Sequence, residues 1–184
     1  ESKLSGIGYT DFINCLWYQR QLTIPSDWQG KHILLHFGAV DYEATIYING
    51  KFVMKHFGTG SSFTADITAF AKPGETVNLV VSVSDDLRAG KQPGGKQSVL
   101  YNSYGCSYTR TTGIWQTVWM EPVSPQGLKQ VIATPDIDQK QLVIRPVFYE
   151  ESMNNTLYIK MLDGSKVVAQ KSVKACNENL IVLP

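Results

Sequence analysis

Two pairs of neighbouring carboxylates are the residues in this sequence best suited to acid–base chemistry. They are Asp85 with Asp86 and Glu150 with Glu151. Hydrolysis of a glycosidic bond generally needs two carboxylates on opposite sides of one sugar. Neighbouring side chains on an extended chain point to opposite sides, so neither pair is arranged for that task. We therefore predict that both pairs are solvated residues of turns or strand edges and that this chain alone carries out no chemistry.

Other catalytic and metal-binding signals are missing from the sequence. It contains no G-x-S-x-G elbow, no phosphate-binding loop and no His-Glu-x-x-His motif. His32 and His36 share a face of a predicted strand without a third ligand, so we expect surface roles for them. The odd set Cys15, Cys106 and Cys176 forms no C-x-x-C pair, and we expect three buried, small apolar side chains. No metal site and no cofactor is predicted.

Composition excludes several classes of partner. The 184 residues carry a net charge of +1 without a run of Lys or Arg, which argues against nucleic-acid binding. No apolar run approaches the roughly 20 residues that span a bilayer, so no membrane partner is expected. Residues 1–8 show no signal peptide. The compartment stays open: periplasmic or secreted if a parent protein carried a signal peptide, and cytoplasmic otherwise.

The elements that must position any site are short, alternating runs separated by turn residues about every ten positions. This pattern predicts an all-β sandwich or barrel, and no long amphipathic helix is present. Asn49-Gly50 predicts a two-residue type I′ hairpin turn. Asp66 is placed to cap a helical turn that Pro73 and Gly74 end. The strands expected in the first part are 16–24, 32–37, 42–48, 51–56, 76–83 and 114–120.

Between the last two of these strands lies a long segment without a period, residues 84–112. It contains five glycines or prolines together with Tyr101, Tyr104 and Tyr108. Loops longer than about 15 residues are uncommon in compact domains and are often functional or disordered. Because disorder favours few aromatic residues, we predict a folded excursion that reaches toward a ligand or partner.

A second part follows a short linker of Pro122, Ser124, Pro125 and Gly127. The stretch from Leu128 onward is shorter than the roughly 100 residues of an immunoglobulin-like sandwich, so this part is predicted to be incomplete. Asp163-Gly164 predicts a second hairpin turn. The expected strands are 128–133, 141–148, 156–162, 166–173 and 180–183.

Aromatic side chains are the other candidates for contact with a ligand, because sugars stack on aromatic faces. For the tryptophans a structural role is favoured, since strand 114–120 is apolar on both faces. For the tyrosines of the excursion, packing and sugar contact are equally plausible. The tryptophans are Trp17, Trp28, Trp115 and Trp119.

An ordered set of short motifs runs through the first part. It comprises Trp17 to Arg20, Ile24-Pro25 with Trp28, Gly30 and Lys31, Leu35 to Asp41, Asn49-Gly50, and the longer stretch Tyr108 to Trp119. Over about residues 6 to 123 these motifs resemble the amino-terminal sugar-binding domain of glycoside hydrolase family 2. Residues after 124 resemble, more weakly, the immunoglobulin-like domain that follows it.

The resemblance implies a jelly-roll sandwich over residues 1–123 and a truncated immunoglobulin-like sandwich over residues 124–184. Family members place a TIM barrel third, and that barrel carries both glutamates of a retaining mechanism. This chain ends before any barrel begins, so the resemblance implies the non-catalytic front of a β-glycosidase, with the β-galactosidase type as our expectation. Its partners would be a β-glycoside, the barrel of the parent chain and, optionally, further copies of the parent.

The resemblance also indicates which residues lie near the sugar. In the β-galactosidase and β-glucuronidase members of the family, the loop before the Gly-Ile element offers an Asp to the sugar, and counting back from Gly113 places Ser107 there instead. Arg110 could contact the sugar or clamp the excursion onto its own domain. The clamp role is favoured. The candidate residues are Asp85, Asp86, Lys96, Tyr108 and Arg110.

Two other functions stay open at this stage. The chain could be a free-standing carbohydrate-binding module without hydrolase activity, which its many aromatic residues would suit. It could also be a structural or adhesion sandwich, which would bind no sugar.

Overall fold

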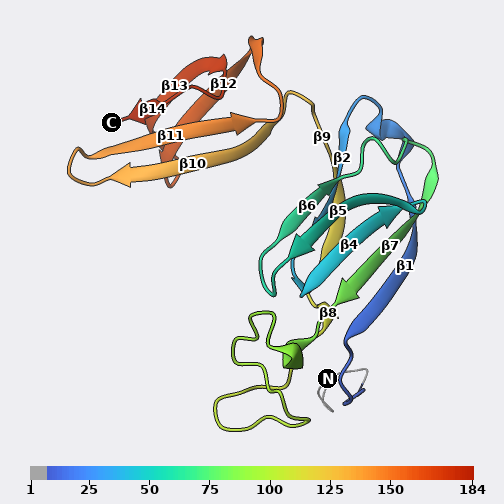
Figure 1. The fold of residues 1–184 in the computed structure, drawn as a ribbon. Coiled ribbons are helices and arrows are strands. Elements are labelled where there is room, and N and C mark those ends of the chain that lie inside the picture. The colour runs from blue at the N-terminus through green and yellow to red at the C-terminus, as the bar shows by residue number, and fades with distance from the viewer. Residues whose placement is uncertain (1–7) are drawn as a thin grey trace. The chain divides into compact units, whose positions relative to one another are not determined.

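The computed structural model describes residues 8–184 and divides the chain into two compact units, Glu1–Val123 and Ser124–Pro184. The predicted absence of a signal peptide concerns residues that lie, apart from Gly8, outside the described part. Strands dominate both units, as the sequence predicts (Figure 1). The helical elements described are two three-residue turns, η1 (Ser26–Trp28) and η2 (Leu87–Ala89). No helix within residues 8–184 has the length and apolarity to cross a membrane.

The first unit is a sandwich of antiparallel sheets. The four-stranded sheet has the order β1-β7-β4-β5, the three-stranded sheet β6-β2-β9, and a two-stranded ribbon pairs β3 with β8. The bounds are β1 Cys15–Thr23, β2 His32–Phe37, β3 Val40–Asp41, β4 Glu43–Ile48, β5 Lys51–Phe57, β6 Phe63–Asp66, β7 Thr76–Ser84, β8 Gly113–Ile114 and β9 Val118–Val123.

Alternation along the strands builds the core of this unit. Every second residue of β7 from Val77 to Val83 is buried, as predicted, and so are Ile46 and Ile48 of β4. They pack against Leu35 and Phe37 of β2 in one continuous cluster. Because side chains of a strand alternate between its two faces, the intervening residues Asn78, Val80 and Ser82 of β7 are only partly buried.

The Asn49-Gly50 hairpin is confirmed. Asn49 and Gly50 both have positive φ, +49° and +76°, as a type I′ turn requires. β4 and β5 pair on either side of the turn, with Ile48 opposite Lys51.

The strand expected at residues 114–120 is broken, and that prediction is corrected. β8 ends at Ile114 and β9 begins at Val118. Between them the chain crosses Gly38, whose N–H donates to the Thr117 carbonyl at 2.9 Å. A Cβ at Gly38 would lie 2.8 Å from the Cβ of Gln116, so only glycine permits this close approach.

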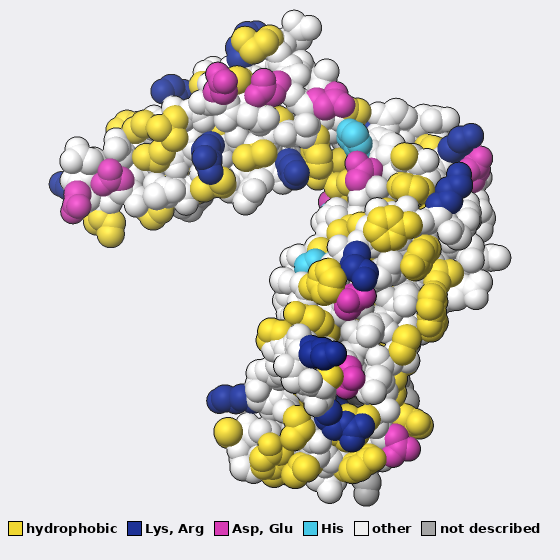
Figure 2. Space-filling model, in the orientation of Figure 1, with side chains coloured by type: hydrophobic (Ala, Val, Ile, Leu, Met, Phe, Trp, Pro, Cys, Tyr) yellow, Lys and Arg dark blue, Asp and Glu magenta, His cyan; other side chains and the backbone are white. Residues whose placement is uncertain are grey.

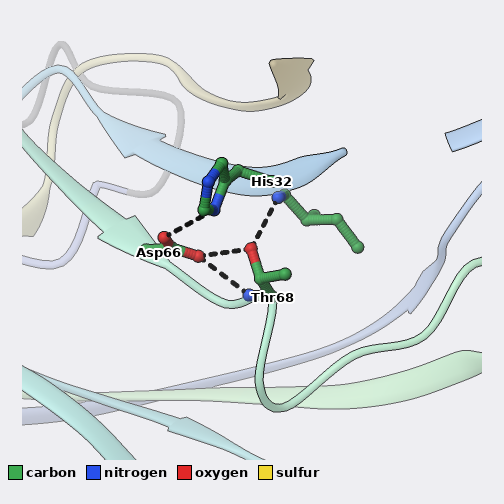
Figure 3. A network of polar contacts seen from close by, with 4 residues as sticks. His32, Asp66 and Thr68 are labelled. Atoms are coloured by element: carbon green, nitrogen blue, oxygen red, sulfur yellow. Dashed lines mark hydrogen bonds and ion pairs between the residues drawn. The ribbon is translucent and has the colours of Figure 1, made fainter. Parts of the chain in front are cut away.

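The turn after β6 contains the polar network of Figure 3. The Asp66 carboxylate accepts from the Thr68 N–H at 3.0 Å and lies 3.3 Å from His32 Nδ1, while Thr68 Oγ1 accepts from the Ile33 N–H. Asp66 therefore caps the turn as predicted, and the Ala71 N–H closes it onto the Ile67 carbonyl.

His36 has comparable partners. Its Nε2 lies 2.9 Å from Glu121, and its ring stacks on Trp119. Among the described residues no group of three His, Cys, Asp or Glu could hold a metal ion.

The second unit has its own small core of Ile144, Ile181 and Leu183. One sheet has the order β10-β11-β14 and the other pairs β12 with β13. The predicted hairpin forms one residue later than expected, since Asp163 pairs with Lys166 around Gly164 and Ser165. Its immunoglobulin-like character stays a prediction. The bounds are β10 Leu128–Asp136, β11 Gln141–Phe148, β12 Ser152–Asp163, β13 Lys166–Ala175 and β14 Ile181–Leu183.

One prediction about burial is wrong. Cys15 and Cys106 are exposed and Cys176 is half-buried, so the thiols are not core side chains. Trp28 packs against the core, whereas the other three tryptophans are largely exposed. Trp17 shows the reason: it occupies an outward position of β1, between Leu16 and Tyr18, which face the core.

Candidate functional site

The excursion, residues 84–112, is folded and projects from the end of the sandwich where β7 stops (Figure 1). Asp85 lies where the excursion leaves β7 and is 3% exposed. The Asp85 carboxylate accepts from Gln92 Nε2 at 2.6 Å and from Thr112 Oγ1 at 2.7 Å. Asp85 therefore ties both ends of the excursion together, and its expected place as a solvated turn residue is corrected.

Burial raises the pKa of the Asp85 carboxyl above its ordinary value. Hydrogen bonds from Thr112 and Gln92 oppose this shift, the negative charge of Asp86 adds to it, and the Arg110 guanidinium opposes it. Desolvation prevails because the charged form loses its water on folding.

This raised pKa predicts a pH dependence of stability. The folded chain holds the Asp85 proton more tightly than the unfolded chain, so the carboxyl stabilises most below its unfolded-state pKa. That contribution is lost as the pH rises through the folded-state pKa. We expect the free energy of unfolding of the wild type, relative to Asp85→Asn, to fall as the pH rises above the ordinary Asp pKa of about 3.9. Urea denaturation measures it, and a relative stability that rises with pH would contradict the assignment.

Arg110 clamps the middle of the excursion. It is 4% exposed and donates from Nη1 to the Leu100 carbonyl at 3.4 Å and from Nη2 to the Thr10 carbonyl. Its guanidinium lies 3.8 Å from the Phe12 ring centroid, and Arg88 lies 3.7 Å from the same centroid. The structure thus agrees with the clamp role favoured for Arg110.

A third buried polar residue, Gln97, connects the excursion to the sandwich. Gln97 Nε2 donates to Asp41 Oδ2 at 2.8 Å, and its Oε1 accepts from the Thr111 N–H at 2.7 Å. Asp41, at the end of β3, is 2% exposed. No sequence motif pointed to Gln97. Its partner Asp41, in contrast, is the last residue of the Leu35 to Asp41 motif.

The remaining candidates lie at the surface of the excursion. Asp86 and Lys96 are exposed, and Tyr108 is 53% exposed. The backbone of Tyr108 is fixed, because its N–H donates to the Lys96 carbonyl and its carbonyl accepts from the Ser98 N–H. Its ring is therefore presented from a rigid position.

Ser107, at the position where family members offer an Asp, lies in a tight turn. Its N–H donates to the Tyr104 carbonyl at 2.7 Å, and its carbonyl accepts from the Tyr104 N–H at 3.1 Å. Tyr104 and Tyr108 flank this turn and are both about half exposed.

A hollow of about 440 Å³ lies where the excursion meets the sandwich. Gly95 and Tyr108 line it from the excursion, and Asp41 and Trp115 line it from the sandwich. The Trp115 indole N–H donates to the Thr59 carbonyl at 2.7 Å, which fixes the ring beside the opening. Aromatic rings around a polar floor are suited to a polyhydroxylated ligand. Of the predicted residues the hollow includes Tyr108, while Asp86 lines a different depression with Tyr42 and Lys91.

The first unit is thus an antiparallel β-sandwich with a hollow at one end. Residues 10–121 match the family described as glycosyl hydrolases family 2, sugar binding domain. The chain belongs to glycoside hydrolase family 2, as its resemblance to the family predicts.

Similar proteins carry names from the same family. A β-galactosidase of Thermoanaerobacter pseudethanolicus is 27% identical over 84% of this chain, and a β-glucuronidase of Canis lupus familiaris is 25% identical over 86%. The solved β-glucuronidase of Ruminococcus gnavus superimposes with a TM-score of 0.70 over 94% of this chain at 23% identity, which shows the shared fold. The chain spans 19% and 27% of the two curated relatives and 29% of the solved chain.

Proposed function

We propose that this chain is the non-catalytic front of a family 2 retaining β-glycosidase. In this proposal the excursion shapes the sugar pocket, and the two units support a TIM barrel that carries the catalytic glutamates. The β-galactosidase and β-glucuronidase names of its relatives support this class of reaction.

The rigid excursion is the observation that carries the proposal. Asp85, Gln97 and Arg110 are buried, and each forms hydrogen bonds with other groups of the first unit. A long loop pinned by buried polar groups keeps one conformation, because opening it would leave those groups unpaired. Pinning of this kind suits a loop that must present Tyr108 to a ligand at a fixed place.

The lining of the hollow also supports a non-catalytic role. Asp41 is the one carboxylate among its lining residues, and its oxygen is engaged by Gln97. A retaining glycosidase needs two carboxyl groups about 5 Å apart on either side of the bond. We assign Asp85 and Arg110 as positioning residues, and Asp86, Lys96 and Tyr108 as the candidates for sugar contact.

The sugar would be a β-galactoside or a β-glucuronide. Our expectation from the sequence is the galactoside, and the β-galactosidase of Thermoanaerobacter pseudethanolicus supports it. The β-glucuronidases among the relatives support the other. Nitrophenyl derivatives of both sugars distinguish these two specificities in the parent enzyme.

A Tyr108→Ala change in the parent enzyme tests the role of the excursion. We expect kcat/KM to fall about two- to tenfold, since an aromatic contact is worth roughly 0.5–1.5 kcal/mol. The melting temperature should hold, because the ring is 53% exposed. Tyr158→Ala is the matched control on β12, where the ring is 77% exposed. Equal kcat/KM values for the two variants would contradict a sugar contact at Tyr108.

A further inference from the structure

The segment that leads into β1, residues 9–14, belongs to no helix or strand, yet it is bound to the excursion; we call it the strap. The Asn14 carbonyl accepts from the Asp85 N–H at 2.9 Å, and the Thr10 carbonyl accepts from Arg110 Nη2. In Figure 1 the strap is the blue segment beside the excursion. Since Asp85 and Arg110 lie near opposite ends of the excursion, the strap bridges its two ends.

The Phe12 ring is the central contact of the strap. The Arg88 guanidinium lies 3.7 Å from the ring centroid, and the Arg110 guanidinium lies 3.8 Å from it. The Tyr101 ring meets Phe12 edge to face, with centroids 5.2 Å apart and planes 76° apart. These partners come from the beginning, the middle and the end of the excursion. A single side chain of the strap therefore holds together three parts of the excursion that are distant in sequence.

Charge makes the Phe12 ring more than an apolar contact. Arg88 and Arg110 carry like charges and repel each other, and Arg88 is exposed, so water could solvate it instead. The negative face of an aromatic ring attracts a guanidinium and offsets this repulsion. Figure 2 shows Lys and Arg side chains among hydrophobic ones at the surface where the excursion projects. The ring thus keeps two cations together that would otherwise separate.

The excursion has little regular structure of its own. Within residues 84–112, all of which the structure describes, the regular elements between β7 and the end of the excursion are η2 and two isolated bridges, Gln97 with Tyr108 and Tyr104 with Ser107. Segments with few ladder hydrogen bonds open at low free-energy cost unless tertiary contacts hold them. The order of the excursion, and the place of Tyr108 on it, must therefore depend on contacts such as those of the strap.

We propose that the strap is a built-in lock on the excursion and that Phe12 is the residue that closes it. Removal of the ring opens the excursion locally, while the sandwich stays folded. The lock works through the attraction of both guanidinium groups to one aromatic face, so an apolar side chain without a ring cannot replace Phe12. The inference concerns the order of the excursion in the 184-residue chain, and it does not rest on the proposed contact of the excursion with a sugar.

Amide hydrogen exchange of the 184-residue chain, resolved by segment, tests this inference. In Phe12→Leu we expect residues 96–108 to exchange about tenfold faster than in the wild type, with β4 and β7 unchanged. Phe12→Trp keeps a ring that attracts cations and should stay within about threefold of the wild type. Phe52→Leu, on β5, is the matched control: its ring is 57% exposed, and its loss should leave the exchange of residues 96–108 unchanged.

Trypsin digestion gives an independent measure of the same opening. Lys91 and Lys96 are exposed residues of the excursion, and cleavage after them should be faster in Phe12→Leu than in Phe12→Trp. The lock is disproved if Phe12→Leu exchanges like the wild type. Equal acceleration in Phe12→Leu and Phe12→Trp would overturn the role of the ring, and acceleration that extends equally to β4 and β7 would show global destabilisation instead of a local lock.

Discussion

Replacing Arg110 by alanine is expected to lower the free energy of unfolding of the first unit by about 3 kcal/mol. The change leaves the Leu100 and Thr10 carbonyls without their donor and removes the guanidinium from the Phe12 ring. Buried acceptors that lose a charged donor cost about 1–3 kcal/mol, and the lost cation–π contact adds about 1 kcal/mol. Urea unfolding followed by tryptophan fluorescence measures the loss.

Arg88 offers a matched control for Arg110. Its guanidinium lies on the same Phe12 ring at 3.7 Å, but the residue is exposed. Arg88→Ala should therefore cost under about 1 kcal/mol. Arg110→Lys should recover little, because an ammonium cannot reproduce the planar fork of donors. Equal losses for Arg88→Ala and Arg110→Ala would show that the clamp on the two carbonyls contributes nothing.

Alanine substitutions of the neighbours Asp85 and Asp86 should change the free energy of unfolding by very different amounts. Asp85→Ala removes the acceptor of Gln92 Nε2 and of Thr112 Oγ1 in a buried place, and we expect a loss of about 2–4 kcal/mol. Asp86→Ala alters an exposed side chain and should stay within about 0.5 kcal/mol. Thermal unfolding of both variants gives the comparison.

The same pair also tests how the base of the excursion affects activity. In the parent enzyme, Asp85→Ala should loosen the excursion and lower kcat/KM more at a temperature near the new melting point than well below it. A stability of Asp85→Ala equal to that of Asp86→Ala would contradict the assignment of Asp85 as the closing residue.

The sequence predicted those parts of the fold that depend on local patterns. The alternation of Val77, Leu79, Val81 and Val83 is enough to define one buried face, and Asn49-Gly50 is enough to define a hairpin. The break between β8 and β9 could not be predicted in this way. It depends on the approach of Gly38 to Gln116, which are far apart in sequence and meet only in the folded sheet.

The candidate site was predictable as a segment but not residue by residue. Composition alone indicated that residues 84–112 fold, because tyrosines gather there among the glycines. The burial of Asp85 depends on Gln92 and Thr112. The burial of Gln97 depends on Asp41, which lies in β3 and far from it in the sequence. The exposure of Trp17 could not be predicted either, because it depends on which face of β1 turns outward in the folded sheet.

The central claim is that this chain belongs to a β-glycosidase and lacks the chemistry itself. Turnover of nitrophenyl β-galactoside and β-glucuronide, by the purified 184-residue chain and by its longer parent, tests the claim most directly. A free-standing carbohydrate-binding module would give no turnover in either form. We predict that the parent hydrolyses at least one of the two substrates and that the chain alone hydrolyses neither. Hydrolysis by the chain alone, or a parent inactive on every common β-glycoside, would contradict it.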